Sequence, residues 1–98
     1  MDRHAALDIL RANEAELRSR GVRHAALFGS VARGEARADS DLDVMIDIDA
    51  RTVGGVYGYV GLCRFIGDLF PVHVDVANRA SLKDRIRQRV EGDAVLAF

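Results

Sequence analysis

Two aspartates separated by one residue stand at the start of the most regular apolar–polar alternation in the chain. Asp41 and Asp43 alternate with Leu42, Val44 and later apolar residues up to Ile48. Residues two apart on a β-strand point to the same face and lie roughly 6–7 Å apart. Carboxylates held side by side repel each other, and a divalent cation that prefers oxygen ligands, such as Mg2+, removes that cost. The spacing indicates a metal site, although an isolated Asp-x-Asp pair is commonly only a surface feature of an edge strand.

A third aspartate has a similar setting further along the chain. Asp75 lies between two valines in the short run Val72–Val76, and His73 shares its side of the expected strand. If this strand neighbours the first, the three carboxylates converge, an arrangement that suits paired metal ions in phosphoryl and nucleotidyl transfer. The alternative is that Asp75 simply faces solvent. His73 is expected at the surface or in support of the site, not as a ligand.

A glycine–serine pair offers a complementary phosphate site. Gly29 and Ser30 follow the apolar run Val22–Phe28 and precede a short expected helical turn over residues 31–34. Glycine lets the backbone approach a phosphate closely, and the free N–H groups at a helix N-terminus favour anions. Together with a metal site these groups would clamp a triphosphate. Taken alone, the same pair is compatible with an ordinary strand-to-helix turn.

One arginine lies close to this turn in the sequence. Arg33 follows Ser30 by three residues. Its guanidinium group would stabilise phosphate charge if it faces the site. The competing interpretation is a surface ion pair with Glu35 or Asp39, and the sequence favours neither.

The expected elements follow the order helix, strand, short helix, strand, helix, strand, helix. They are a helix over Asp2–Arg20, a strand over Val22–Phe28, the turn over 31–34, a strand over Asp41–Ile48, a helix over Thr52–Phe70, a strand over Val72–Val76 and a last helix that starts with a capping box of Ser81 and Asp84. Pro71 ends the long helix, whose glycines indicate an irregular first turn. This order predicts an α/β (α+β) fold with a small mixed sheet of three to four strands flanked by helices.

Length and composition fit a single domain over residues 1–98. The 49% hydrophobic and 30% charged content is ordinary for a globular protein. A net charge of -1 gives no general attraction to nucleic acid, so direct nucleic-acid binding is not expected. The single cysteine, Cys63, cannot form an internal disulfide, and no apolar run is long enough for a membrane span. A cytoplasmic location is expected.

The combined motifs resemble those of the polymerase-beta-like nucleotidyltransferase superfamily. Gly29-Ser30, ten intervening residues and Asp41-Leu42-Asp43 are similar to its signature, and Val74-Asp75-Val76 is similar to its third acidic strand. The resemblance implies the nucleotidyltransferase fold and an enzyme that uses Mg2+, with two ions, and ATP. It also implies that Asp75 assists deprotonation of the attacking hydroxyl. The implied site residues are Asp41, Asp43 and Asp75 for catalysis and metal binding, and Gly29, Ser30 and Arg33 for nucleotide binding.

The short chain resembles the minimal members of this superfamily. Such members are antitoxins encoded beside a HEPN-domain ribonuclease toxin, and they transfer AMP from ATP to a tyrosine of that toxin. The resemblance therefore implies a protein adenylyltransferase whose partner is a HEPN toxin. Two alternatives stay open: nucleotidyl transfer to a small-molecule hydroxyl, with a partner chain completing the site, and a binding module that neutralises the toxin without catalysis.

Overall fold

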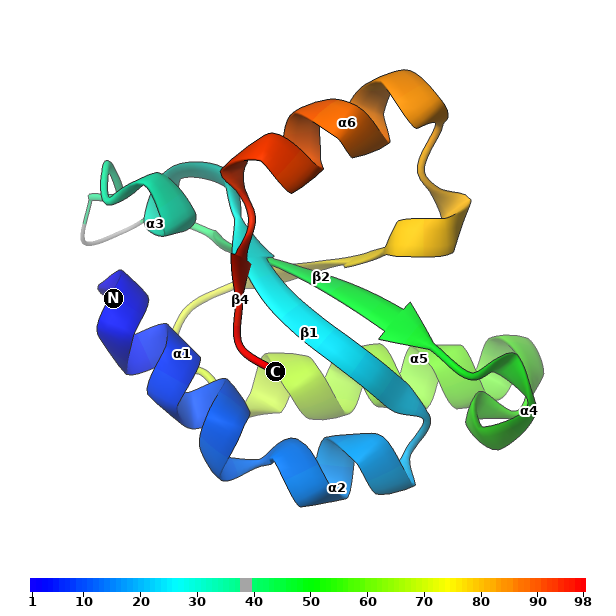
Figure 1. The fold of residues 1–98 in the computed structure, drawn as a ribbon. Coiled ribbons are helices and arrows are strands. Elements are labelled where there is room, and N and C mark those ends of the chain that lie inside the picture. The colour runs from blue at the N-terminus through cyan, green and yellow to red at the C-terminus, as the bar shows by residue number, and fades with distance from the viewer. Residues whose placement is uncertain (38–39) are drawn as a thin grey trace.

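A four-stranded mixed sheet forms the centre of the molecule (Figure 1). The computed structural model describes residues 1–37 and 40–98. The strands are β1 (Val22–Phe28), β2 (Leu42–Ile48), β3 (Val74–Asn78) and β4 (Val95–Leu96). Their order is β3-β2-β1-β4, with β2 and β3 parallel and the other pairs antiparallel. The predicted mixed sheet is confirmed, and each of its first three strands lies within two residues of its predicted place.

Helices cover the sheet unequally. They are α1 (Arg3–Ala12), α2 (Glu14–Ser19), α3 (Gly29–Arg33), α4 (Ala50–Val53), α5 (Gly55–Asp68), the 3-10 helix η1 (Arg79–Ser81) and α6 (Asp84–Asp93). Figure 1 shows α1, α2 and α5 below the sheet and α6 above it. Within the described residues, no helix combines the length and apolarity that crossing a membrane requires.

The core lies between the sheet and the helices below it. Leu42, Val44 and Ile46 of β2 are at most 1% exposed and pack in one cluster with residues of α1, α2 and α5, such as Leu10 and Leu17. Full burial of a leucine or isoleucine side chain contributes roughly 1.5–3 kcal/mol. The alternation of β2 therefore fixes which way its aspartates face, because the apolar residues take the core side.

The predicted single helix over Asp2–Arg20 is wrong at Asn13. The chain leaves the helical conformation there, and the Asn13 side-chain amide donates a hydrogen bond to Ile9 O at 2.8 Å. Asparagine side chains compete in this way with backbone hydrogen bonds. The interruption turns α2 relative to α1, so that both helices place a buried leucine against the sheet.

The second long helix is also divided, as its glycines indicated. Gly54 and Gly55 have φ angles of +82° and +84°, which separate α4 from α5. Such angles favour glycine because a Cβ would be strained. Further along, a Cβ on Gly58 would overlap the backbone carbonyl of Val53. Gly58 therefore allows α5 to pack directly against the end of α4.

The last helix starts differently from its prediction. Helix α6 begins at Asp84 with Lys83 as its N-cap residue, and no side chain caps it. Ser81 instead belongs to η1, where the Asn78 side chain accepts a hydrogen bond from Ala80 N at 3.2 Å. The predicted capping box of Ser81 and Asp84 is therefore wrong, because Ser81 is the last residue of η1 and Lys83 is the N-cap residue of α6.

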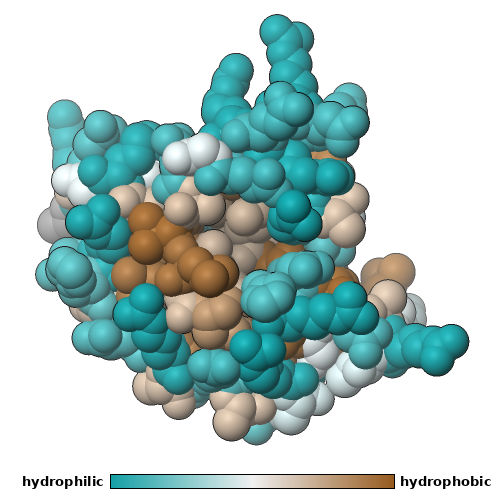
Figure 2. Space-filling model, in the orientation of Figure 1, coloured by the Kyte–Doolittle hydropathy of each residue, from teal (hydrophilic) through white to brown (hydrophobic). Residues whose placement is uncertain are grey.

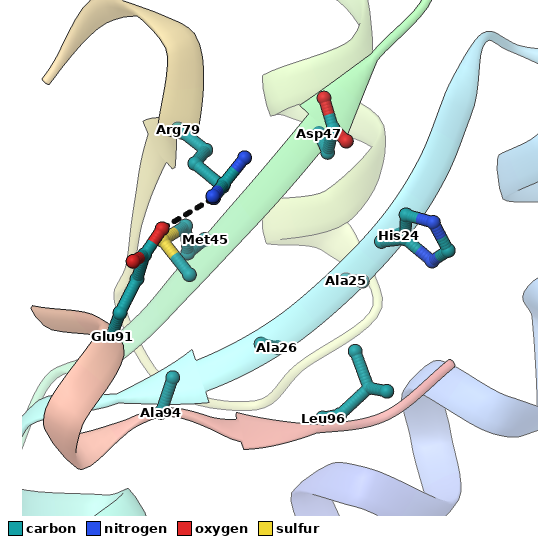
Figure 3. Close-up of a pocket in the computed structure, with 9 residues that line it drawn as sticks. All are labelled: His24, Ala25, Ala26, Met45, Asp47, Arg79, Glu91, Ala94 and Leu96. Atoms are coloured by element: carbon teal, nitrogen blue, oxygen red, sulfur yellow. Dashed lines mark hydrogen bonds and ion pairs between the residues drawn. The ribbon is translucent and has the colours of Figure 1, made fainter. Parts of the chain in front are cut away.

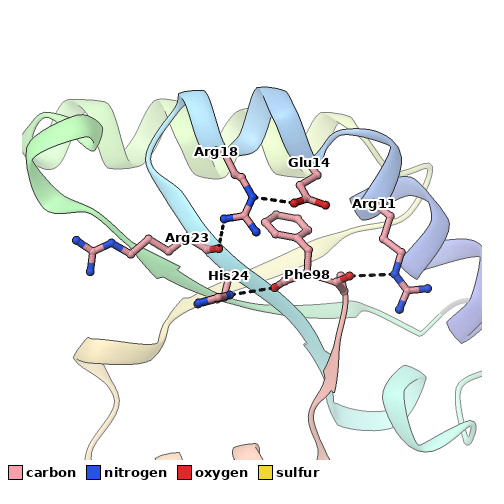
Figure 4. A network of polar contacts seen from close by, with 7 residues as sticks. Arg11, Glu14, Arg18, Arg23, His24 and Phe98 are labelled. Atoms are coloured by element: carbon pink, nitrogen blue, oxygen red, sulfur yellow. Dashed lines mark hydrogen bonds and ion pairs between the residues drawn. The ribbon is translucent and has the colours of Figure 1, made fainter.

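The strand β4 and the residues after it were not predicted. Ala97 N donates to Ala25 O at 2.8 Å, which extends the two-residue pairing of β4 with β1. Arg11 Nε donates to Ala97 O at 2.9 Å, and the Arg18 guanidinium lies 5.0 Å from the centre of the Phe98 ring (Figure 4). Side chains of α1 and α2 thus hold this segment in place.

In the orientation of Figure 1, hydrophobic side chains gather near the middle of an otherwise largely hydrophilic surface (Figure 2).

Candidate active site

The pairing of β2 with β3 brings the three aspartates together. Asp43 and Asp75 are register partners on these parallel strands, and Asp41 directly precedes β2. Side-chain donor atoms of Asp41, Asp75 and His73 all lie within 4.8 Å of one another. The expectation that Asp75 joins Asp41 and Asp43 depended on its strand lying next to theirs, and β3 does lie next to β2 in the fold.

Negative charge accumulates at Asp43. Partial burial of this carboxyl raises its pKa above the ordinary value, and the nearby charges of Asp75 and Asp41 raise it further, while Arg33 opposes them. Each cause that raises the pKa disfavours the ionised form. The fold thus gathers oxygen donors whose charge the protein compensates only in part. Such a set fits a hard divalent cation.

Gly29 lies directly against Asp43. The register of β1 and β2 pairs Phe28 with Asp43, so the chain enters α3 beside this carboxylate. Gly29 has a φ angle of +73°, and a Cβ there would overlap Asp43 Oδ2. Both facts restrict the position to glycine. Ser30 follows as the second residue of α3, where the first N–H groups of a helix have no intrahelical acceptor.

Arg33 is held by two acidic side chains. Its Nε donates to Glu35 at 3.0 Å and its Nη1 to Asp93 at 3.2 Å. The hydrogen bond with Glu35 is the largest cause of the raised pKa of Arg33. The pair with Glu35, one of the two alternatives that the sequence left open, is thus present, whereas Asp39 lies outside the described residues. The contact with Asp93 was not predicted, since only the fold places α6 beside α3.

His73 lies closer to the carboxylates than the sequence indicated. Its Nδ1 is 3.6 Å from Asp41 Oδ1 and 3.8 Å from Asp75 Oδ1. The side chain is 68% exposed, which agrees with the expected surface position. The sequence signal for this proximity was the two-residue spacing, which puts His73 and Asp75 on the same face of the expected strand Val72–Val76.

A cavity of about 260 Å³ lies further along the same face of the sheet (Figure 3). Its floor includes Met45 and Ala26, which are register partners on β2 and β1. On one side the Arg79 guanidinium donates to Glu91 at 2.6 Å, which joins η1 to α6. The cavity was not predicted, since its walls come from segments that are distant in sequence. The three aspartates of the candidate site thus lie on the same face of the sheet as this cavity, which has an apolar floor and a charged rim.

Comparison with known proteins gives matches over most of the chain. A family model described as "Nucleotidyltransferase domain" matches residues 10–97. The protein adenylyltransferase MntA of Thermococcus cleftensis is 36% identical over 88 residues, which cover 89% of this chain and 87% of that protein. A solved structure described as a "putative minimal nucleotidyltransferase" has a TM-score of 0.68 at 34% identity and covers 97% of this chain and 95% of its own.

A further match concerns the fold alone. The crystal structure of a toxin-antitoxin with AMP-PNP has a TM-score of 0.70 at 18% identity. The match covers 90% of this chain and 72% of that one. The arrangement of sheet and helices described above therefore recurs in proteins with very different sequences.

Proposed function

The chain belongs to the nucleotidyltransferase domain family and is a nucleotidyltransferase, and from that premise we propose that it transfers AMP from ATP to a tyrosine of a HEPN-domain toxin, as the antitoxin of that toxin. The relative from Thermococcus cleftensis, a protein adenylyltransferase, supports a protein acceptor. The toxin-antitoxin with the same fold supports a toxin partner. The observation that carries the catalytic part of the proposal is the register of Asp43 with Asp75 beside Gly29.

Gly29 and Ser30 bind the triphosphate in this proposal. The Ser30 hydroxyl and the N–H groups that begin α3 donate hydrogen bonds to oxygens of the β- and γ-phosphates. The absence of a side chain at Gly29 leaves room for the carboxylate of Asp43 beside this turn. Arg33 exchanges one of its two acidic partners for a phosphate oxygen.

Asp41, Asp43 and Asp75 hold divalent cations, two Mg2+ ions in this proposal. When bound, such ions neutralise and orient the charged phosphates. The raised pKa of Asp43 supports this role, because it reflects carboxylates that a cation would stabilise in their ionised form.

Asp75 accepts the proton of the tyrosine hydroxyl, directly or through water. The phenolic oxygen attacks the α-phosphorus and forms a new phosphorus–oxygen bond. The bond from the α-phosphorus to the oxygen that bridges to the β-phosphate breaks, and pyrophosphate leaves with that electron pair. The product is a phosphodiester that links AMP to the tyrosine.

The test combines the chain with ATP labelled at the α-phosphate, Mg2+ and the HEPN-domain protein encoded by the adjacent gene. We expect label on a toxin tyrosine, located by mass spectrometry, and no label with Asp43→Asn. Asp47→Asn is the matched control, because Asp47 lies on the same face of β2 but four residues beyond Asp43. Toxin neutralised equally by Asp43→Asn would favour binding without catalysis. Label found on a small molecule alone would favour the other alternative.

A further inference from the structure

We propose that His73 is a ligand of the divalent cation that Asp41 and Asp75 hold, and that its imidazole shifts the preference of this site from Mg2+ toward transition-metal ions. This inference rests on the proposed function to the extent that Asp41 and Asp75 bind a metal. It adds to that function a nitrogen ligand and a different class of cation.

The backbone holds His73 at the end of the site. Leu42 N donates to His73 O at 2.9 Å, which continues the pairing of β2 and β3 one residue beyond β3. His73 therefore stands beside Asp41, the residue before Leu42, and on the same face as Asp75. Its position follows from strand pairing and does not depend on a flexible loop.

The distances suit a shared ion better than direct hydrogen bonds. His73 Nδ1 lies 3.6 Å from Asp41 Oδ1 and 3.8 Å from Asp75 Oδ1, beyond the usual range for N–H to oxygen hydrogen bonds. Ligand atoms about 2.1 Å from one octahedral ion are themselves about 3–4 Å apart. All three donor atoms lie within 4.8 Å of one another. Both distances from His73 thus fall in the range expected of two ligands of one ion.

The same side chains remain open to solvent on their outer side. The exposed fractions are 68% for His73, 57% for Asp41 and 58% for Asp75. An ion held by three such groups keeps further coordination positions for water and phosphate oxygens. This openness is what a site for nucleotide transfer requires, in contrast to a closed structural metal site.

The mixed set of donors determines the choice of ion. Carboxylates and water alone favour Mg2+, whereas an imidazole nitrogen favours ions such as Fe2+, Co2+, Ni2+ and Zn2+. Replacing the imidazole with a methyl group leaves the two carboxylates and so restores an oxygen site. The transition-metal affinity should fall much more than the Mg2+ affinity.

The test measures binding of Co2+ and of Mg2+ to the full chain by calorimetry. We expect His73→Ala to weaken Co2+ binding at least about tenfold and to change Mg2+ binding less than about threefold. His4→Ala is the control, because His4 is exposed on α1 and is not part of the group formed by Asp41, His73 and Asp75. In proton NMR spectra, Co2+ should shift the ring protons of His73 and leave those of His4 in place.

Two results would overturn the inference. Unchanged Co2+ binding with unshifted His73 signals would exclude ligation. Tighter Mg2+ binding by His73→Ala would show that the ring only offsets the charge of the carboxylates. Asp41→Asn separates this failure from that of the proposed function. If Asp41→Asn loses the metal and His73→Ala keeps it, only the role of His73 is wrong, whereas unchanged binding by Asp41→Asn refutes the metal site itself.

Discussion

Gly29 and Asp43 are in such close contact that a methyl group on Gly29 would overlap Asp43 Oδ2. The turn that begins α3 and the carboxylate of Asp43 are therefore packed directly against each other. A change at the turn must move the carboxylate, because the backbone of β1 and β2 fixes the distance between them.

Gly29→Ala should consequently impair both stability and catalysis. We expect it to lower the free energy of unfolding by at least about 1 kcal/mol more than Gly34→Ala, and to reduce nucleotide transfer about 100-fold. Gly34 is a matched control, since it has a φ angle of +74° but open space around its Cβ position. Both positions have a positive φ angle of similar size, and urea denaturation compares the two variants. Equal losses of stability would contradict the steric contact.

The raised pKa of Asp43 predicts a specific dependence of stability on pH. In the folded state this carboxyl holds its proton to a higher pH than in the unfolded state, so ionisation destabilises the fold as pH rises through the interval between the two pKa values. Without divalent cations, Asp43→Asn should therefore be more stable than the parent at about pH 7, and the difference should shrink on acidification. Urea denaturation at several pH values in EDTA measures this. A difference that grows toward low pH would have the wrong sign.

The glycines of α5 should respond to alanine in opposite directions. Gly58→Ala should destabilise the protein by about 1–3 kcal/mol, because its Cβ overlaps the carbonyl of Val53. Gly61→Ala, three residues later in the same helix with no atom nearby, should stabilise it by about 0.5–1 kcal/mol. Thermal denaturation compares the two. Stabilisation by both changes would mean that α4 and α5 are not packed as described.

Arg33 can be tested for a role beyond its ion pairs. If its guanidinium contacts phosphate, Arg33→Ala should raise KM for ATP about tenfold, because a charge-assisted hydrogen bond is lost. Asp93→Ala removes one of the ion pairs but keeps the guanidinium, so it should leave KM nearly unchanged. Steady-state kinetics of both variants decide the point. The same rise in KM in both would mean that Arg33 acts only by joining α3 to α6.

Sequence periodicity was sufficient to predict how side chains face where one side of a strand is buried in the core. The alternation of Leu42, Val44 and Ile46 correctly predicted which side of β2 carries Asp43, since the core takes the apolar side. The break at Asn13 was missed because leucines continue on both sides of it and the break depends on one bond from a side chain to the backbone. The two residues of β4 are too few for any periodic signal.

The candidate site shows the same division between local and distant information. Asp41 and Asp43 follow from spacing within one strand, whereas Asp75 joins them only through the pairing of β2 with β3. The positions of His73 beside Asp41 and of Asp93 beside Arg33 depend on where separate segments meet. The sequence shows which residue types are present, but it does not show which of these segments come into contact in the fold.

The parallel pairing of Asp43 with Asp75 joins strands that α4 and α5 separate along the chain. In the unfolded chain these carboxylates are not neighbours, so a cation that they hold together has no comparable site there. A ligand that binds only the folded state shifts the folding equilibrium toward it in proportion to RT ln(1 + [L]/Kd). If the proposed site binds a divalent cation, a free cation concentration above its Kd therefore raises the folded population and, through that population, the lifetime of the protein against proteases.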